Sequence, residues 1–482
     1  MANDLPVLNR LFLDDPATLR GDAAGILVGH EAIGEFRVGR GGAPAREILH
    51  VEVVEIDPDA ALVIAVTQPA TGGRGQQSQL WIRVGGEWRV RAAHVSLPMP
   101  ALNPAVWRVA GSPLVAGAPN GPLAGETVAV KDLYSIAGFA VGGGVPAYLA
   151  EAQPALATSP AVQALLDAGA AITGIAQTDE FAYSIAGRNP HYGTPPNPAV
   201  VGGVPGGSSS GPASAVALGQ ASIGLSTDTA GSIRVPASYQ GLWGLRSTHG
   251  AVPDVGILPL ARTFDAPGWI TRSPAVLRGA VEATLHEHAG VGGIVVDPAL
   301  AAQAEPDVRR AFDAFIADRF ETVDLGDSQE FFETFRTVQQ AEAWRTHGAW
   351  ILAHPGALGG DVAGRFELAS RVTADQEDAA RATLTRLALH LDTVLGDRVL
   401  LVPSASSVAP AITADSSLIE RTRASTLRMT AVAGITGRPA LSAPLLSVAQ
   451  PGALLPAPVG VSLVGPRHSE LALIALAESL AG

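Results

Sequence analysis

Two clusters of serine, threonine and glycine residues lie close together in the chain and have the residue types that nucleophilic chemistry requires. The first, Gly206–Gly211, predicts an irregular loop, because glycine tolerates backbone angles that side chains forbid and serine bonds to its own backbone. The second, Thr227–Arg234, predicts a tight turn. Such a turn can aim several backbone N–H groups at one point, as an oxyanion site needs.

A proton acceptor for these hydroxyls has to come from elsewhere in the sequence. The two clusters contain no histidine and no G-x-S-x-G elbow. The apolar run Glu126–Leu133 contains Lys131, and burial of this amine would lower its pKa and let it accept a proton near neutral pH. Two ordinary alternatives stay open: a strand-end lysine that extends to solvent, and a glycine-rich run that is only a linker or a phosphate-binding loop.

The elements around the clusters predict an α/β fold. Pro212–Leu218 predicts a short helix and Ile223–Leu225 a strand. Apolar periodicity predicts helices over Val308–Phe320 and Phe331–Glu342, whose aromatic stripes are typical of core packing, strands at Val399–Pro403, Pro439–Pro444 and Val459–Pro466, and a last helix from His468. Strands that alternate with helices favour a mixed β-sheet covered by helices on both faces.

The first hundred residues predict a small α+β domain. Gly29–Phe36 has helical spacing, and strand patterns follow at Ile48–Ile56 and Ala61–Val66. A hairpin then surrounds the two-residue turn Gly85-Gly86, and its alternation predicts one buried face. The prolines beyond it predict a linker without secondary structure. The expected boundaries are 1–97 for the small domain, 98–120 for the linker and 121–482 for the larger domain.

Composition excludes several classes of protein. The chain has 482 residues, of which 47% are hydrophobic and 16% charged, as in a packed globular enzyme. Its net charge of -13 argues against a nucleic acid or an anionic membrane as partner. The absence of cysteine excludes disulfides and thiolate metal sites. Without a leader pattern or a membrane-spanning run, a cytoplasmic protein is expected.

The stretch from Gly206 to Ser247 resembles the signature of the amidase signature family, the Ser-cisSer-Lys amidohydrolases. The likeness continues upstream through Asp179–Ser184 and His191–Pro198 and downstream to Trp269, and it covers roughly residues 120 to 480. Within the family, the plant-type indole-3-acetamide amidases are the most similar subgroup. The resemblance implies the amidase signature fold and hydrolysis through an acyl-enzyme, with no cofactor and no metal.

The resemblance also implies a role for individual residues. Lys131 is implied as the base, Ser208 as the bridging serine after a cis Gly207–Ser208 peptide bond, and Ser232 as the nucleophile. The implied oxyanion donors are the backbone N–H groups of Thr229, Ala230, Gly231 and Ser232. The residues implied to hold the surrounding loops are Asp132, Gly207, Asp228 and Arg234. The chain departs from the family's usual glycine at Ser226 and Ala230, and allophanate hydrolases of the same family are similar in having Thr-Ala-Gly-Ser.

The N-terminal segment resembles the AtzH-like family, whose cone-shaped fold is related to nuclear transport factor 2. The residues that carry this likeness are Leu11-Phe12 to Ile33 and Gln77 to Ser96, and much of the family's first helix is expected to be missing. Such cones often dimerise through their open sheet. A homodimer formed through this domain is therefore expected.

These observations predict a serine amidohydrolase that cleaves the C–N bond of a small, neutral amide with an aromatic or apolar body. A carbamate, a urea-like compound such as allophanate or an ester is the alternative substrate for the same triad. A binding protein on an amidase scaffold is the alternative of another class, and the joint presence of Lys131, Ser208 and Ser232 argues against it. A transamidation subunit for tRNA-linked chemistry has no support in an acidic chain with this N-terminal domain.

Overall fold

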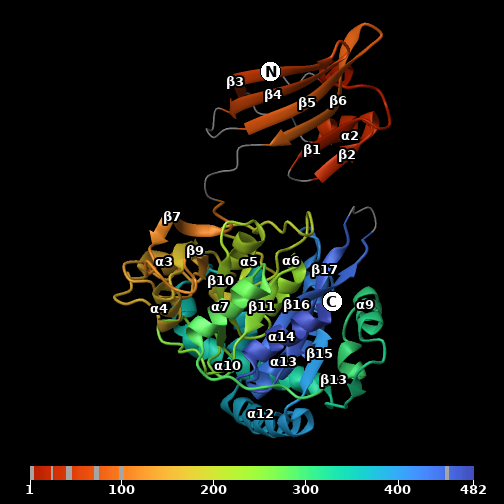
Figure 1. Ribbon diagram of the computed structural model, residues 1–482. Coiled ribbons are helices and arrows are strands. Elements are labelled where there is room, and N and C mark those ends of the chain that lie inside the picture. The colour runs from red at the N-terminus through yellow and green to blue at the C-terminus, as the bar shows by residue number, and fades with distance from the viewer. Residues whose placement is uncertain are drawn as a thin grey trace. The chain divides into compact units, whose positions relative to one another are not determined.

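The chain folds into two compact units, Met1–Asn103 and Pro104–Gly482. The computed structural model in Figure 1 describes residues 5–22, 25–39, 46–69, 75–96, 103–450 and 455–481. In these residues no helix is both long and apolar enough to cross a membrane.

The N-terminal unit is a six-stranded sheet with two helices, so the predicted α+β domain is confirmed. Its elements are α1 (Leu5–Leu11), β1 (Leu19–Asp22), β2 (Gly25–Val28), α2 (His30–Gly39), β3 (Arg46–Asp57), β4 (Ala60–Pro69), β5 (Gly75–Val84) and β6 (Glu87–Ser96). The strand order is β2-β1-β6-β5-β4-β3, and only the β1–β6 pair is parallel. Gly85 and Gly86 both have positive φ, as the tight β5–β6 turn requires.

The core of the N-terminal unit is small. Phe12, Ile33, Val90 and Ala93 form a buried cluster, and Trp81 of β5 packs against it. The alternation in the hairpin predicted one buried face, but β5 is half-buried or exposed from Gln76 to Val84. The prediction holds only in part: Val90 and Ala93 of β6 are buried, whereas β5 is less covered because the described residues of this unit provide only two helices to pack on the sheet.

The C-terminal unit is built on an eleven-stranded mixed sheet. Its strands are β7 (Trp107–Val115), β8 (Thr127–Lys131), β9 (Ala171–Ala176), β10 (Ile223–Asp228), β11 (Trp243–Arg246), β12 (Ala266–Thr271), β13 (Ile294–Val296), β14 (Glu321–Thr322), β15 (Val399–Pro403), β16 (Ala440–Val448) and β17 (Ala457–Val464). They follow the order β14-β13-β15-β17-β16-β11-β12-β10-β8-β9-β7. Strand β8 is parallel to both neighbours and lies between β10 and β9.

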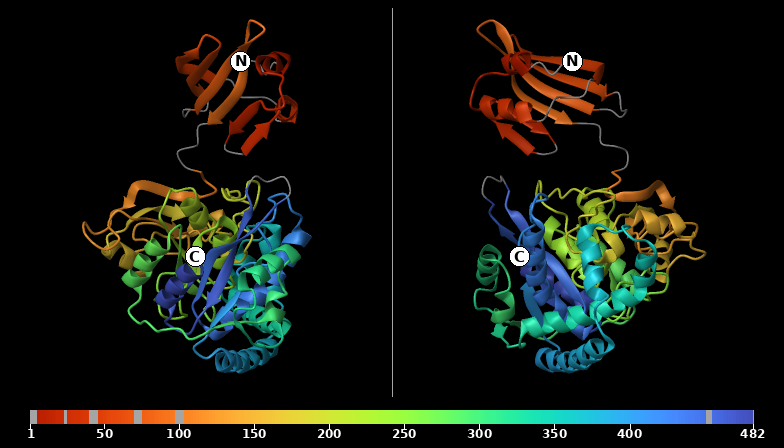
Figure 2. Two further views of the ribbon diagram at one scale, coloured as in Figure 1. Left: turned by 45° about the vertical axis from the view of Figure 1, so that its right-hand side comes forward. Right: turned by 180° about the vertical axis from the view of Figure 1, so that it is seen from behind.

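Helices cover both faces of this sheet, as predicted (Figure 2). They are α3 (Pro146–Glu151), α4 (Pro160–Asp167), the 3₁₀ turn η1 (Glu180–Ala182), α5 (Ser210–Ala217), α6 (Arg234–Gln240), α7 (Pro274–Thr284), α8 (Pro298–Ala301), α9 (Pro306–Ile316), α10 (Ser328–Ala353), α11 (Gly360–Ala369), α12 (Ala374–Leu395), α13 (Ser416–Thr436) and α14 (Glu470–Ala481). Neighbouring residues of β12 show the two layers. Ile270 joins the apolar cluster of α5 and α6, whereas Trp269 joins the cluster that contains α7.

The segment expected to be a linker is partly a strand. β7 lies within residues 98–120 and pairs with β9 at the edge of the large sheet, with irregular register on either side of Ala110. The prolines misled the prediction because proline is tolerated in edge strands and at bulges. Pro113 occupies such a position, after a cis Ser112–Pro113 bond.

The aromatic stripe of α10 belongs to the core, as predicted. Phe331 and Phe335 are buried, and the Phe335 ring lies 4.3 Å from the ring of Phe264. Phe264 directly precedes Asp265, which contacts the second hydroxyl cluster. The core contact therefore fixes the loop that carries Asp265 against α10.

Candidate active site

Lys131 lies at the carboxyl end of the buried strand β8 and is fully buried. It is the only lysine in the chain, whose other basic residues are all arginine or histidine. Its Nζ lies 2.8 Å from Ser208 Oγ, 2.9 Å from Ser209 Oγ and 3.0 Å from Thr227 Oγ1. The alternative of a strand-end lysine that reaches solvent is therefore wrong.

The surroundings of Lys131 favour the uncharged amine. Burial lowers the pKa of Lys131 from its ordinary value of 10.5 to about 7, although the carboxylates of Asp179, Asp228 and Asp265 act in the opposite direction. Its nearest polar neighbours are hydroxyls, which can donate to a neutral amine as well as accept from an ammonium. At neutral pH a large fraction of Lys131 can thus accept a proton.

The first hydroxyl cluster presents Ser208 to this amine. The Gly207–Ser208 peptide bond is cis, which confirms the expectation. Thr178 Oγ1 donates to the Ser208 carbonyl oxygen at 2.9 Å, and the Asp179 N–H donates to the same oxygen at 3.2 Å. A Cβ on Gly207 would lie 2.3 Å from Asp179 Oδ2, so the backbone packs against this carboxylate only because residue 207 is glycine.

The second cluster forms the connection between β10 and α6, with Ser232 buried in it. The Ser209 N–H donates to the Ser232 carbonyl oxygen at 3.3 Å, which brings the two clusters together. In the described residues, the backbone N–H groups of Thr229, Ala230 and Ser232 have no acceptor. The Gly231 N–H instead donates to Asp228 Oδ1 at 2.9 Å. Gly231 is thus removed from the predicted set of oxyanion donors.

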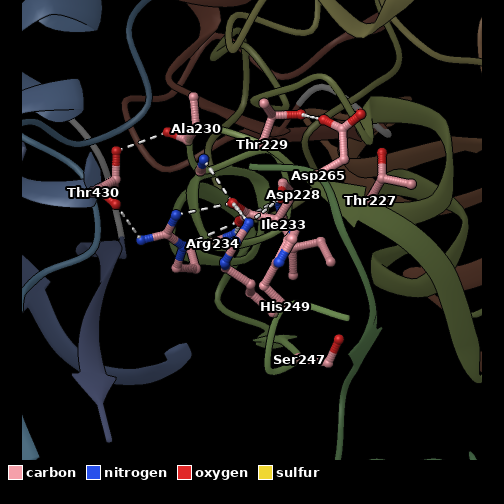
Figure 3. A network of polar contacts seen from close by, with 12 residues as sticks. Thr227, Asp228, Thr229, Ala230, Ile233, Arg234, Ser247, His249, Asp265 and Thr430 are labelled. Carbon is pink, nitrogen blue, oxygen red and sulfur yellow. Dashed lines mark hydrogen bonds and ion pairs between the residues drawn. The ribbon is translucent and has the colours of Figure 1, made fainter. Parts of the chain in front are cut away.

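Asp228 holds the turn in shape (Figure 3). Besides the Gly231 N–H, it accepts the Ile233 N–H at 3.1 Å and two bonds from the Arg234 guanidinium, at 2.9 and 3.1 Å. Burial by itself would raise the pKa of Asp228, but Arg234 and Arg246 hold it well below its usual range. A charged carboxylate therefore organises the backbone that flanks Ser232.

Two residues outside the predicted set brace the same turn. Thr430 of α13 donates to the Ala230 carbonyl oxygen at 2.7 Å, and its own carbonyl oxygen accepts from Arg234 at 3.0 Å. On the other side, Thr229 Oγ1 donates to Asp265 Oδ1 at 2.5 Å. Figure 3 shows Thr430 and Asp265 on opposite sides of the turn. Thr430 lies two hundred residues from its partner, and no local pattern marks it.

Asp132 serves a neighbouring loop. Its Oδ1 pairs with Arg108 Nε at 3.1 Å and accepts the Gly142 N–H at 3.0 Å. Burial raises its pKa to about 6, and Arg108 opposes this shift. Asp132 thus fixes the segment that follows Lys131, which is a positioning role.

A small cavity lies beside the paired clusters. Its lining includes Leu133, Ala182, Thr227, Thr229 and Asp265, together with residues 257–260. In the described part of the chain, no group of three or more histidine or acidic side chains is placed to hold a metal ion.

Comparison with known proteins assigns the chain to a class. The family model described as Amidase matches residues 105–310, and the model described as AtzH-like matches residues 1–100. Amidase 1 of Arabidopsis thaliana is 34% identical over 401 residues, which cover 74% of this chain and 93% of that protein. The chain belongs to the amidase family and is a hydrolase of carbon–nitrogen bonds.

Other relatives agree with this assignment. The 2-amino-5-chloromuconic acid deaminase of Comamonas testosteroni is 33% identical over 386 residues, covering 74% of this chain and 81% of that protein. A solved structure described as an amidase is 30% identical with a TM-score of 0.67, covering 75% of this chain and 86% of that one. The α/β fold with a mixed sheet is thus that of the amidase signature enzymes.

Proposed function

We propose that the chain hydrolyses a small amide through an acyl-enzyme, with Ser232 as nucleophile, Ser208 as bridging hydroxyl and Lys131 as base. The observation that carries the proposal is the buried Lys131 amine, whose pKa is lowered to about 7 and which lies 2.8 Å from Ser208 Oγ. A base whose pKa lies near the working pH is largely unprotonated and still has enough affinity to take up a proton.

The proposed reaction passes a proton from Ser232 through Ser208 to Lys131. Neutral Lys131 takes the proton of the Ser208 hydroxyl while Ser208 takes that of Ser232, and Ser232 Oγ bonds to the carbonyl carbon. The developing oxyanion accepts from N–H groups of residues 229, 230 and 232, and removing one such donor typically costs about 3 to 4 kcal/mol. The proton returns to the leaving nitrogen, and the C–N bond breaks. Water then attacks the ester with the same relay and releases the acid.

A second substrate class is supported by one observation. Ala230 stands where the family commonly has glycine. The allophanate hydrolases of the family also have alanine at this position, in the sequence Thr-Ala-Gly-Ser. Its carbonyl oxygen is held by Thr430 and its side chain is buried, so its methyl group narrows the space beside the oxyanion donors. A planar carbamate or urea-like carbonyl is the alternative substrate. Parallel assays of aryl amides, alkyl amides, carbamates and esters of the same acyl group decide between them.

Labelling with a serine-directed fluorophosphonate tests the nucleophile. We expect Ser232→Ala to abolish both labelling and amide turnover. Ser214→Ala is the matched control: Ser214 is a buried serine of α5 that donates to Pro196 rather than to the triad, and this variant should label normally. Unchanged labelling of Ser232→Ala would remove Ser232 from its role.

We further propose that two copies of the chain associate through the N-terminal unit. Its family match is AtzH-like, and strand β3 forms one edge of its sheet. Val53, Val54 and Ile56 are each more than half exposed, and successive residues of a strand point to opposite faces. An edge strand that is apolar on both faces needs a cover, and a second copy of the strand has matching chemistry.

Light scattering of the full chain tests this association. We expect a dimer for the native chain and a monomer for Val53→Lys. Leu389→Lys, which places the same charge at an exposed apolar position of α12, should remain dimeric. A native chain that is monomeric at micromolar concentration would contradict the proposal.

A further inference from the structure

One buried histidine, His347 of α10, holds a residue of the small cavity. It is 3% exposed, and burial lowers the pKa of its imidazole from 6.5 to about 4. The ring is therefore neutral at neutral pH and carries a single N–H group. Nε2 lies 2.8 Å from the carbonyl oxygen of Pro259, and this oxygen can only accept. Nε2 is therefore the donor, and the bond fixes Pro259 against α10.

The same imidazole stacks on Phe181 in the 3₁₀ turn η1. The two ring centres are 4.3 Å apart and the ring planes differ by 19°. Phe181 and Ala182 have φ angles of 45° and 58°, which residues with a side chain rarely adopt and which persist only where the surroundings hold them. The Phe181 ring is held by His347 and by edge contacts with Tyr148 and Trp350. His347 thus helps to fix the turn that presents Ala182.

Both contacts of His347 lead to the lining of the small cavity. Pro259 lines the cavity directly, and the turn held through Phe181 contributes Ala182 to the lining. Thr229, whose N–H is a proposed oxyanion donor, lines the same cavity. One side chain thus connects two segments of the lining that are far apart in the sequence, next to a proposed donor to the substrate carbonyl.

The neighbours of Pro259 are fixed by hydrogen bonds of their own. The Leu258 N–H donates to the Leu133 carbonyl oxygen at 2.8 Å, and the Leu260 N–H donates to Asp265 Oδ2 at 2.9 Å. Pro259 has no N–H group, and its carbonyl oxygen is held by the imidazole. Loss of the bond from the imidazole should therefore release Pro259 while the backbone on either side stays in place.

The small cavity has room for little more than one small group. Its volume is about 20 Å³, whereas a cavity that binds benzene measures about 150 Å³ and one that holds a water molecule about 10 to 15 Å³. In its observed width it can therefore take a methyl or methylene group but no aromatic ring. Most of its lining is apolar and includes Leu133, Ala182, Ile257, Leu258, Pro259 and Leu260.

We propose that His347 determines substrate specificity by fixing the width of the small cavity, and that the cavity limits the acyl part of the substrate to a short aliphatic chain. This inference rests on the proposed amidase function and narrows the aromatic or apolar body expected from the sequence. An acyl chain that fits places its carbonyl group next to Thr229, which lines the same cavity. A longer chain or an aromatic ring has to displace Pro259 or Ala182. His347 acts through these two residues and is a positioning residue.

Primary amides test the size limit on the native chain, because their leaving group is ammonia and only the acyl part varies. The probes run from acetamide to hexanamide, with phenylacetamide as the aromatic member. We expect kcat/KM to fall by at least about tenfold for the methylene that exceeds the cavity, since one methylene in an apolar pocket changes discrimination by about 10- to 200-fold. A kcat/KM that stays level or rises through the series, or that is the same for phenylacetamide as for propanamide, would overturn the size limit.

Two variants separate the hydrogen bond of His347 from its stacking. His347→Phe keeps a ring on Phe181 and removes the donor to Pro259. We expect kcat/KM for the shortest amide that the native chain excludes to rise by about tenfold in this variant, while kcat for the best short amide changes little. His347→Gln keeps a donor and should retain the native size limit. An unchanged length profile in His347→Phe, or an equal loss of activity for all lengths in the folded variant, would overturn the assignment.

His354→Phe is the matched control. His354 also stacks on an aromatic ring, 4.2 Å from that of Trp350, and bonds to a carbonyl oxygen of α10, but its partners are Trp350 and Glu151 rather than residues of the cavity lining. Its length profile should equal that of the native chain. If His347→Phe does not fold, Leu258→Ala, which enlarges the cavity directly, should extend the accepted acyl chain in the same way. A native length profile in a folded Leu258→Ala chain would contradict the acyl assignment.

Binding to the inactive Ser232→Ala chain separates this inference from the function on which it rests. Ligand-detected NMR should show binding of the short amides and loss of binding for the longer ones, and His347→Phe in the same background should extend the range of lengths that bind. Equal binding of all lengths contradicts the size limit. Length-selective binding without turnover by the native chain contradicts the hydrolytic proposal and leaves the role of His347 standing.

Discussion

Replacing Lys131 by methionine tests whether burial really keeps this amine uncharged. The pKa of Lys131 is about 7 in the fold and 10.5 in its ordinary state. Because the folded pKa is the lower one, the unfolded chain binds more protons between these values, and the native chain loses stability as pH falls through that window. One pKa unit corresponds to about 1.4 kcal/mol, so lowering the pH from 10 to 7 costs the native fold about 3 kcal/mol through this one group.

The methionine variant lacks the pH dependence of stability that comes from Lys131. The difference in unfolding free energy between the two chains therefore measures the contribution of Lys131 alone. We expect the unfolding free energy of Lys131→Met, measured by urea titration, to gain about 3 kcal/mol relative to the native chain between pH 10 and pH 7. The lost hydrogen bonds to Ser208, Ser209 and Thr227 lower stability at both pH values and largely cancel. Arg386→Met, at an exposed position, is the control and should show no pH-dependent difference. A stability difference between Lys131→Met and the native chain that stays constant within about 1 kcal/mol would show that the Lys131 amine stays charged in the fold.

Three further substitutions probe the positions around the triad. Gly207→Ala should abolish activity and lower stability, because the added Cβ would lie 2.3 Å from Asp179 Oδ2. The control Gly364→Ala, which has open space at its Cβ, should be tolerated. An active Gly207→Ala enzyme would contradict the close packing of Gly207 against Asp179. Thr430→Val should lower kcat by about tenfold with little change in KM, because one hydrogen bond to the Ala230 carbonyl oxygen is lost; a change confined to KM would assign Thr430 to substrate binding instead. Asp179→Asn should shift the acidic limb of the pH–rate profile to lower pH, because the Asp179 charge raises the pKa of Lys131; a shift to higher pH would contradict this electrostatic coupling.

Much of the fold follows from local patterns in the chain. The strand that ends at Lys131, the helix after the first hydroxyl cluster and the strands near the C-terminus all lie within a few residues of where local sequence patterns predict them. The failure at β7 has a physical reason. Proline is read as a signal for a linker, but an edge strand with irregular register accommodates it.

Part of the candidate site can be predicted from local sequence, and part depends on contacts between distant segments. The residue types in the two clusters predict a loop and a turn, and the resemblance supplies the roles of the three residues. The bracing by Thr430 and Asp265 depends on contacts between distant segments that only the folded chain reveals. The use of the Gly231 N–H by Asp228 depends on the exact path of the turn. A further sequence signal points to the proposed base: Lys131 is the single lysine of the chain and ends an apolar run.

The single lysine also permits the most direct test of the proton relay. Protein labelled with ¹³C only at lysine Cε gives one side-chain resonance, which reports the charge of Lys131. We expect this resonance to titrate with a midpoint near pH 7, in step with the rise of kcat/KM with pH. A midpoint near the ordinary value of 10.5, with full activity at pH 8, would show that the charged form is present during turnover and would contradict Lys131 as the base.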